Sequence, residues 1–62
     1  MFQVITEKKI RKTNDTSTGG KLYLWIKEIA GTEEAINVQN WSELATDGDY
    51  YEGENFEVIR IA

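Results

Sequence analysis

The sequence predicts a small α+β domain spanning residues 1–62, with a three- to four-stranded, mainly antiparallel sheet and one short helix. Three observations support this fold class. Apolar and polar residues alternate at both ends of the chain, a strongly apolar stretch lies between them, and a short segment with a capping residue favours a helix. The same strands could also close on themselves, so an all-β, barrel-like domain is the alternative.

Residues 2–12 are predicted to form the first strand. Phe2 and Val4 fall on one side of an extended chain and polar residues fall between them, although the alternation weakens toward the charged end. Residues 13–20 consist only of Thr, Asn, Asp, Ser and Gly, which favour turns. This segment is too long for a tight hairpin, so we expect a loop.

Residues 21–30 contain the most apolar run of the chain, and we expect a central strand there. Large apolar side chains occupy both faces of the extended segment: Leu22, Leu24 and Ile26 on one face, and Tyr23, Trp25 and Ile29 on the other. A helix would also accommodate these residues, but their aromatic and β-branched content favours the strand. Trp25 and Trp41 are expected to belong to the core, because a chain this short needs their large rings there.

Residues 32–46 allow two interpretations. Thr32 could begin a single helix with acidic residues in its first turn, where the helix dipole favours them. Alternatively, residues 34–39 form a strand and Asn40 caps a short helix after it. We favour the second interpretation, because the apolar residues of 34–39 alternate with polar ones and several residues there are weak helix formers.

The last part of the chain is predicted to end in a strand. Asp47, Gly48 and Asp49 end the helix, and residues 50–55 form a loop or a short irregular strand. Residues 56–61 alternate well and form the final strand, with Phe56 and Val58 on one face. This strand lacks proline and has one basic residue, so its edge could pair with a second copy of the chain.

The composition restricts the chemistry. The chain has no cysteine and no histidine, which excludes disulfides, thiolate zinc sites and the commonest general base. No pattern of nucleophile and base and no phosphate-binding glycine loop occurs, so we expect neither an enzyme nor a cofactor. No signal peptide and no membrane-length apolar stretch occur, and we expect a cytoplasmic protein without membrane contact.

The segment that starts at Asp47 resembles the beginning of a calcium-binding loop, but it lacks the remaining ligands. An EF-hand loop needs an oxygen ligand, a glycine and a glutamate at its fifth, sixth and twelfth positions, and here these are Tyr51, Glu52 and Val58. Asp47, Asp49 and Glu52 could at most form a weaker cation site. We therefore expect no metal.

The charges are divided along the chain. Residues 1–27 carry six basic and two acidic residues, and residues 28–62 carry one basic and nine acidic residues. The basic cluster, a candidate site for nucleic-acid phosphates, comprises Lys8, Lys9, Arg11 and Lys12. Strand alternation places Lys8 and Lys12 on one face and the other two on the opposite face. This division makes nucleic acid an unfavoured partner.

The acidic segment 43–57 is the stronger candidate for a binding surface. Tyrosine rings supply contact area at a low entropic cost, and carboxylates steer association with a basic partner. The predicted partner-binding residues are Glu43, Asp47, Asp49, Tyr50, Tyr51, Glu52 and Glu54. A solvated acidic loop that only keeps the domain soluble is the simpler alternative.

The function that follows is that of a non-enzymatic protein-binding module, which docks through its acidic surface onto a larger protein with a basic surface. Its size and charge are typical of accessory or inhibitor proteins of phages and mobile elements. Two alternatives remain: a self-assembling structural subunit that uses edge strands, which would make a homo-oligomer, and a nucleic-acid-binding protein that uses the basic cluster.

Overall fold

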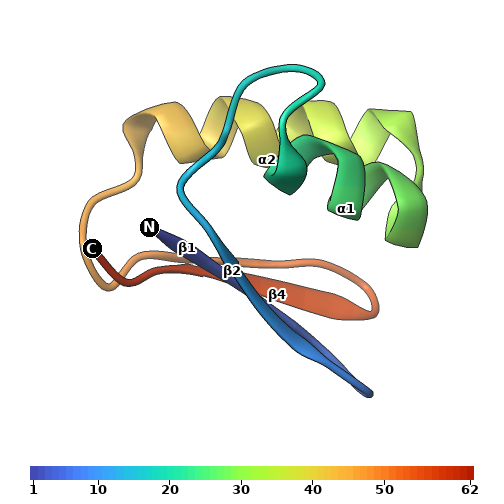
Figure 1. Ribbon diagram of the computed structural model, residues 1–62, viewed down its shortest axis with the longest axis horizontal. Helices are drawn as coiled ribbons and strands as arrows, with labels where there is room; N and C mark the ends of the chain where they lie inside the picture. The colour runs from blue at the N-terminus through green and yellow to red at the C-terminus, as the bar shows by residue number, and fades with distance from the viewer.

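Four strands and two helices form two layers in the computed structural model, which describes residues 1–62 (Figure 1). The sheet is one layer, and both helices lie on the same face of it. This arrangement confirms the α+β prediction, with two helices instead of one. In chain order the elements are β1 (Phe2–Thr6), β2 (Ile10–Thr13), α1 (Lys21–Ala30), α2 (Thr32–Leu44), β3 (Tyr50–Glu52) and β4 (Phe56–Arg60).

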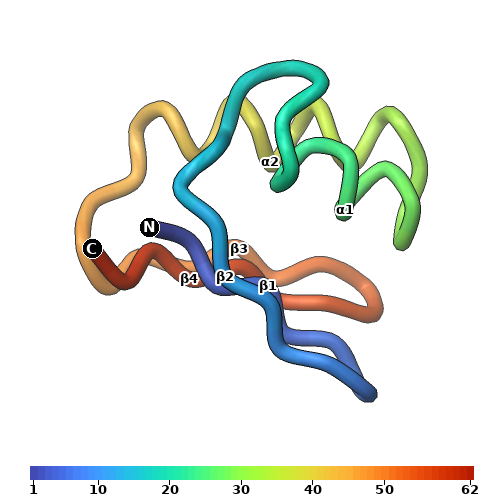
Figure 2. The backbone as a smooth tube through the Cα atoms, in the orientation of Figure 1, coloured from blue at the N-terminus to red at the C-terminus, as the bar shows by residue number.

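The first and last strands form the centre of the sheet. The strand order is β2-β1-β4-β3, and every neighbouring pair is antiparallel. Both chain ends therefore lie close together (Figure 2), and the Ile61 N–H donates a hydrogen bond to the Met1 carbonyl at 2.8 Å. Because β4 has a partner on each side, it has no free edge, and the prediction that its edge could pair with a second copy of the chain is wrong. The two edge strands are β2 and β3.

The register divides the sheet residues between a covered and an uncovered face. Val4 lies opposite Val58 and Phe2 lies opposite Arg60, so these side chains point to the helices. The core combines Phe2, Val4, Phe56 and Val58 from the sheet with Leu22, Ile26, Ala35, Val38 and Ala45 from the helical part. Every one of these side chains is at most 6% exposed, so the core lies between the two layers.

Both tryptophans pack against this core, as expected. The Trp41 ring lies 5.9 Å from the rings of Phe2 and of Tyr51 and thereby joins β1 to β3. The Arg11 guanidinium lies over the Trp25 ring at 5.3 Å, which attaches α1 to the edge strand β2.

The prediction of a strand over residues 21–30 is wrong, because these residues form α1. Leu22 and Ile26 are buried, and Trp25 and Ile29 pack beside them on the same side. Their spacing of three, four and seven residues is the helical repeat, and one stripe of side chains faces the sheet. Leu24, on the opposite side of the helix, is 47% exposed.

The favoured strand over residues 34–39 is also wrong, and the single-helix interpretation is confirmed. Val38 is fully buried whereas Ile36 is 45% exposed, although both would share one face of a strand. The first predicted strand, residues 2–12, is instead a hairpin that turns at residues 7–9. The loop predicted over residues 13–20 begins one residue later, because Thr13 ends β2. The short strand after residue 49 and the final strand agree with the sequence analysis.

Gly31 makes the corner between the two helices. Its φ of 93° lies in a region that favours glycine, its N–H donates to the Lys27 carbonyl at 2.9 Å, and its carbonyl accepts from the Ala35 N–H at 3.1 Å. One residue thus ends α1 and begins α2. The corner allows both helices to lie on one face of the sheet.

Replacing Gly31 with L-alanine should lower the free energy of unfolding by about 1–3 kcal/mol, because this backbone conformation is strained for any L-residue with a Cβ. No heavy atom lies within 4 Å of the position where that Cβ would stand, so the loss would be conformational and not steric. Urea denaturation measures the change. D-Alanine at position 31, introduced by chemical synthesis, is the matched control and should retain the stability of the native chain. Equal stability of the two alanine variants would contradict this account of the corner.

Candidate functional site

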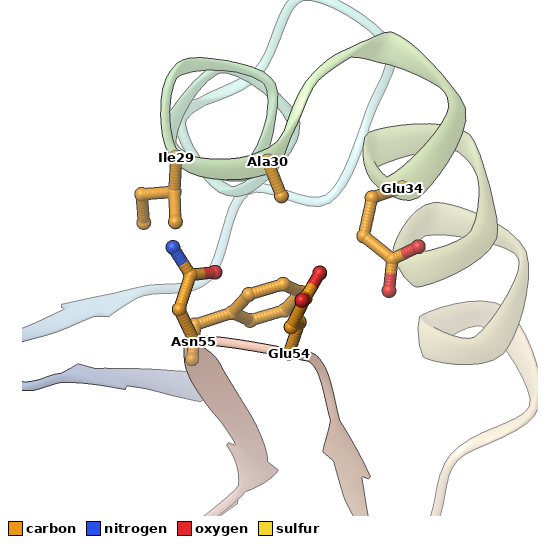
Figure 3. Close-up of a pocket in the computed structure, with 6 residues that line it drawn as sticks. Ile29, Ala30, Glu34, Glu54 and Asn55 are labelled. Atoms are coloured by element: carbon orange, nitrogen blue, oxygen red, sulfur yellow. The ribbon is translucent and has the colours of Figure 1, made fainter.

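The largest cavity opens between the α1–α2 corner and the turn that joins β3 to β4 (Figure 3). Its volume is about 450 Å³. We call it the corner cleft; its lining residues are Ile29, Ala30, Glu34, Glu54, Asn55 and Phe56. Residues from two distant parts of the sequence therefore meet at one cavity.

Glu34 reaches the corner cleft from the first turn of α2. A carboxylate is favourable in this turn because the unpaired backbone N–H groups carry partial positive charge. The Tyr51 hydroxyl donates a hydrogen bond to Glu34 Oε1 at 2.7 Å, which fixes the carboxylate and leaves its second oxygen without a side-chain donor. The hydrogen bond to Glu34 and the partial burial of the ring raise the pKa of Tyr51 above its ordinary value.

Glu54 faces Glu34 from the opposite side of the corner cleft. In Figure 3 the Glu34 carboxylate points toward the β3–β4 turn, and the Glu54 carboxylate points toward the helices. The Gly53 N–H donates to the Phe56 carbonyl at 2.9 Å, which closes the turn and positions Glu54. Phe56 is buried and Ile29 half-buried, so the lining combines two carboxylates with apolar surface.

No cation of the chain neutralises either carboxylate. The one ion pair of the protein joins Arg60 Nε and Asp47 at 3.5 Å, at a different place. Lys8 is the one basic residue that lines a cavity, and it lies in a second hollow of about 310 Å³ that shares Ile29 and Asn55 with the corner cleft. The corner cleft is therefore a negatively charged cavity with an apolar wall.

The structure separates the partner-binding residues that the sequence analysis grouped together. Asp47 pairs with Arg60, and Asp49 accepts hydrogen bonds at one carboxylate oxygen from the Thr46 N–H and hydroxyl, so both stabilise the loop before β3. Glu43 is exposed near the end of α2, far along the helix from Glu34.

The two tyrosines of the predicted surface point to opposite faces of the sheet. Tyr51 lies on the covered face, between Trp41 and Phe56, so it cannot serve as the exposed anchor that we expected. Tyr50 is 61% exposed and, like Glu52, lies on the uncovered face. Only Glu54 of the predicted set lines the corner cleft.

The basic cluster does not form one surface. Lys8 and Lys9 lie in the β1–β2 turn, Arg11 points to Trp25 on the covered face, and Lys12 lies on the uncovered face. The opposite orientations of Arg11 and Lys12 agree with the predicted alternation, whereas Lys8 and Lys9 lie in a turn and not in the predicted strand. A stripe of cations with exposed aromatic rings, typical of single-strand binding, is not formed by these residues.

Glu34 and Asn55 are site residues that the sequence analysis did not identify. Glu34 was recognised only as an acidic residue of a helix start, in the interpretation that was not favoured. No local pattern connects it to residue 54, because their proximity depends on how α2 packs on β3 and β4.

Three further findings concern the chain as a whole. No three acidic side chains converge in a way that could hold a metal ion. Neither helix is long and apolar enough to cross a membrane. Comparisons of the chain with protein-family models, with curated proteins and with solved structures find no match.

Replacing Tyr51 with phenylalanine should lower the free energy of unfolding by about 1 kcal/mol at neutral pH, because one side-chain hydrogen bond is lost. The effect should depend on pH. The pKa of Tyr51 is raised in the folded state. The stability that its hydroxyl contributes is therefore fully present below about pH 10, and it is lost as the pH rises through the pKa of the folded state.

The measurement is urea denaturation at a series of pH values from neutral to alkaline. The difference between the native chain and Tyr51→Phe should shrink at the alkaline end. Tyr50→Phe is the control, since the Tyr50 hydroxyl makes no hydrogen bond in the protein, and it should show little difference at any pH. If Tyr51→Phe lowered the free energy of unfolding by the same amount at every pH, the Tyr51–Glu34 hydrogen bond would not be the cause.

Proposed function

We propose that this protein is a non-enzymatic binding module that docks onto a larger protein by accepting an arginine or lysine side chain in the corner cleft. The observation that carries this proposal is the pair formed by Glu34 and Glu54, two carboxylates that face one cavity without a cation of their own. The head group of a basic side chain bound in the corner cleft would form charge-assisted hydrogen bonds with these carboxylates.

The lining matches the chemistry of a long basic side chain. Such a side chain has an apolar stem and a charged head, and it commonly buries the stem along an apolar wall. Ile29 and Phe56 offer that wall, and the two carboxylates stand where the head would lie. Arginine fits best, because its planar guanidinium has five donors and can bind two carboxylates at once.

The charge of the surrounding surface also favours a basic partner. The chain has a net charge of −4, and Glu33, the neighbour of Glu34 in α2, is an exposed acidic residue. Carboxylates around a docking site raise the rate of association with a basic surface and suppress acidic partners. An accessory or inhibitor protein of a phage or mobile element, acting in the cytoplasm, is the setting that we propose for such a module.

The proposal predicts that a single arginine suffices for recognition. N-acetyl-arginine amide, titrated against ¹⁵N-labelled protein, should shift the amide resonances of residues around the corner cleft, with weak affinity. Glu34→Gln or Glu54→Gln should weaken this binding by about tenfold, since a charge-assisted hydrogen bond is replaced by a neutral one.

Two controls separate the corner cleft from the general negative charge of the protein. Glu33→Gln removes the same charge from the neighbouring position of α2 without changing the lining, and it should bind like the native chain. N-acetyl-citrulline amide has nearly the same shape as the arginine compound but no charge, and it should not bind. The proposal fails if no resonance of the corner cleft shifts, or if Glu33→Gln weakens binding as much as Glu34→Gln.

A further inference from the structure

Two cavities adjoin at the end of the sheet that lies nearest to the α1–α2 corner. The second hollow is lined by Thr6, Glu7, Lys8, Ile29 and Asn55, and the last two residues also line the corner cleft. Because the two linings share these residues, the cavities lie side by side. We call the corner cleft and the second hollow together the end groove.

The register of the central strands explains why the two cavities adjoin. Thr6 lies opposite Phe56 in the β1–β4 pair, so the β1–β2 turn lies beside the β3–β4 turn. Both turns are at the same end of the molecule as the α1–α2 corner (Figure 2). The Thr6 N–H donates to the Lys9 carbonyl at 2.9 Å, and the Lys9 N–H donates to Thr6 Oγ1 at 3.2 Å, which closes the β1–β2 turn. The end groove therefore runs past two closed turns of the sheet.

The two parts of the end groove differ in charge. The corner cleft contains Glu34 and Glu54 and no basic residue, whereas the second hollow contains Glu7 and Lys8. The one ion pair of the chain lies elsewhere, so the Lys8 ammonium is not paired with Glu7 or with any other carboxylate of the chain. A ligand that occupies both parts therefore needs a basic group at one end and an acidic group at the other.

The Asn55 side chain lies where the two parts of the end groove meet. It points toward Ile29 of α1 (Figure 3), and its amide makes no hydrogen bond within the chain. An asparagine amide offers both donors and an acceptor, and a backbone peptide group needs one of each. The middle of the end groove therefore suits the backbone of a peptide.

We propose that the end groove binds an extended segment of the partner protein, with a basic side chain in the corner cleft and an acidic side chain two residues away against Lys8. This inference rests on the proposed function, and it adds the kind of segment that carries the basic residue. Successive side chains of an extended segment point to opposite sides, whereas alternate ones point to the same side about 7 Å apart. Alternate residues are thus the nearest pair that can enter two adjoining cavities.

The acidic residue of the segment provides a test in which the sign of the effect is decisive. The protein has a net charge of −4, so general electrostatics disfavours any peptide with an added carboxylate. Contact with Lys8 favours it. The probes are acetyl-Ala-Arg-Ala-Glu-Ala-amide and its counterpart with Gln in place of Glu. A second pair has Arg and Glu exchanged, because either chain direction places both side chains on one side.

The measurement is a titration of ¹⁵N-labelled protein with each peptide at low ionic strength. In one of the two orders, the glutamate peptide should bind about threefold more tightly than the glutamine peptide, which is typical of an exposed ion pair. Lys8→Gln should abolish this preference. Glu7→Gln should enlarge it, because a carboxylate that competes for Lys8 is removed from the second hollow.

The matched control is Lys9→Gln, which removes the same charge from the next position of the β1–β2 turn. Lys9 lines neither cavity, so this variant should retain the preference for glutamate. Circular dichroism of each variant establishes that it is folded. The inference is overturned if Lys9→Gln removes the preference as completely as Lys8→Gln, because the carboxylate would then respond to the charge of the turn and not to the second hollow.

Titration with N-acetyl-arginine amide distinguishes failure of this inference from failure of the proposed function. If that compound binds in the corner cleft while the glutamate and glutamine peptides bind equally in both orders, the inference is overturned and the proposed function is retained. If neither that compound nor any of the peptides binds, both are overturned.

Discussion

The pairing of β1 with β4 is the constraint on which the rest of the structure depends. These two strands are the ends of the chain, and every other element is attached to them: β2 and β3 lie outside them, and both helices cover them. The contact joins residues that are far apart in sequence, such as Val4 and Val58, so the entropic cost of closing the whole chain must be met before the core can form. A 62-residue domain has little stability in excess of this cost.

The same pairing determines where the basic and the acidic part of the sequence lie in the structure. Because β1 and β4 are central, each carries its hairpin partner to a different edge of the sheet. The basic N-terminal hairpin and the acidic C-terminal hairpin therefore lie beside each other without neutralising each other, and only Arg60 forms an ion pair. The observed order places the basic and the acidic hairpin on opposite sides of the β1–β4 pair.

The final strand and the loop before α1 were more predictable than the two helices, for a physical reason. The final strand and the loop over 14–20 follow from local alternation and turn residues, which act over a few neighbours. Residues 21–30 contain both a strand signal, their aromatic and β-branched side chains, and a helical signal, the spacing of Leu22, Trp25, Ile26 and Ile29. Packing on the sheet decides for the helix, because the helix buries one stripe of these side chains while a strand would have two apolar faces to cover. Only part of the corner cleft could be predicted from the sequence. Glu54 belongs to the acidic segment 43–57, whereas the position of Glu34 opposite it depends on tertiary packing.

The corner cleft lies where the two layers of the fold do not cover each other completely. Two helices of 10 and 13 residues cover one face of a four-stranded sheet, and neither of them covers the other face. At the α1–α2 corner the helical layer turns back on itself, while the β3–β4 turn extends beside it, so the two layers separate and the corner cleft opens. Glu34 and Glu54 face this cavity without an ion pair inside the chain. This is the geometric reason why we propose that a basic side chain of another protein binds there.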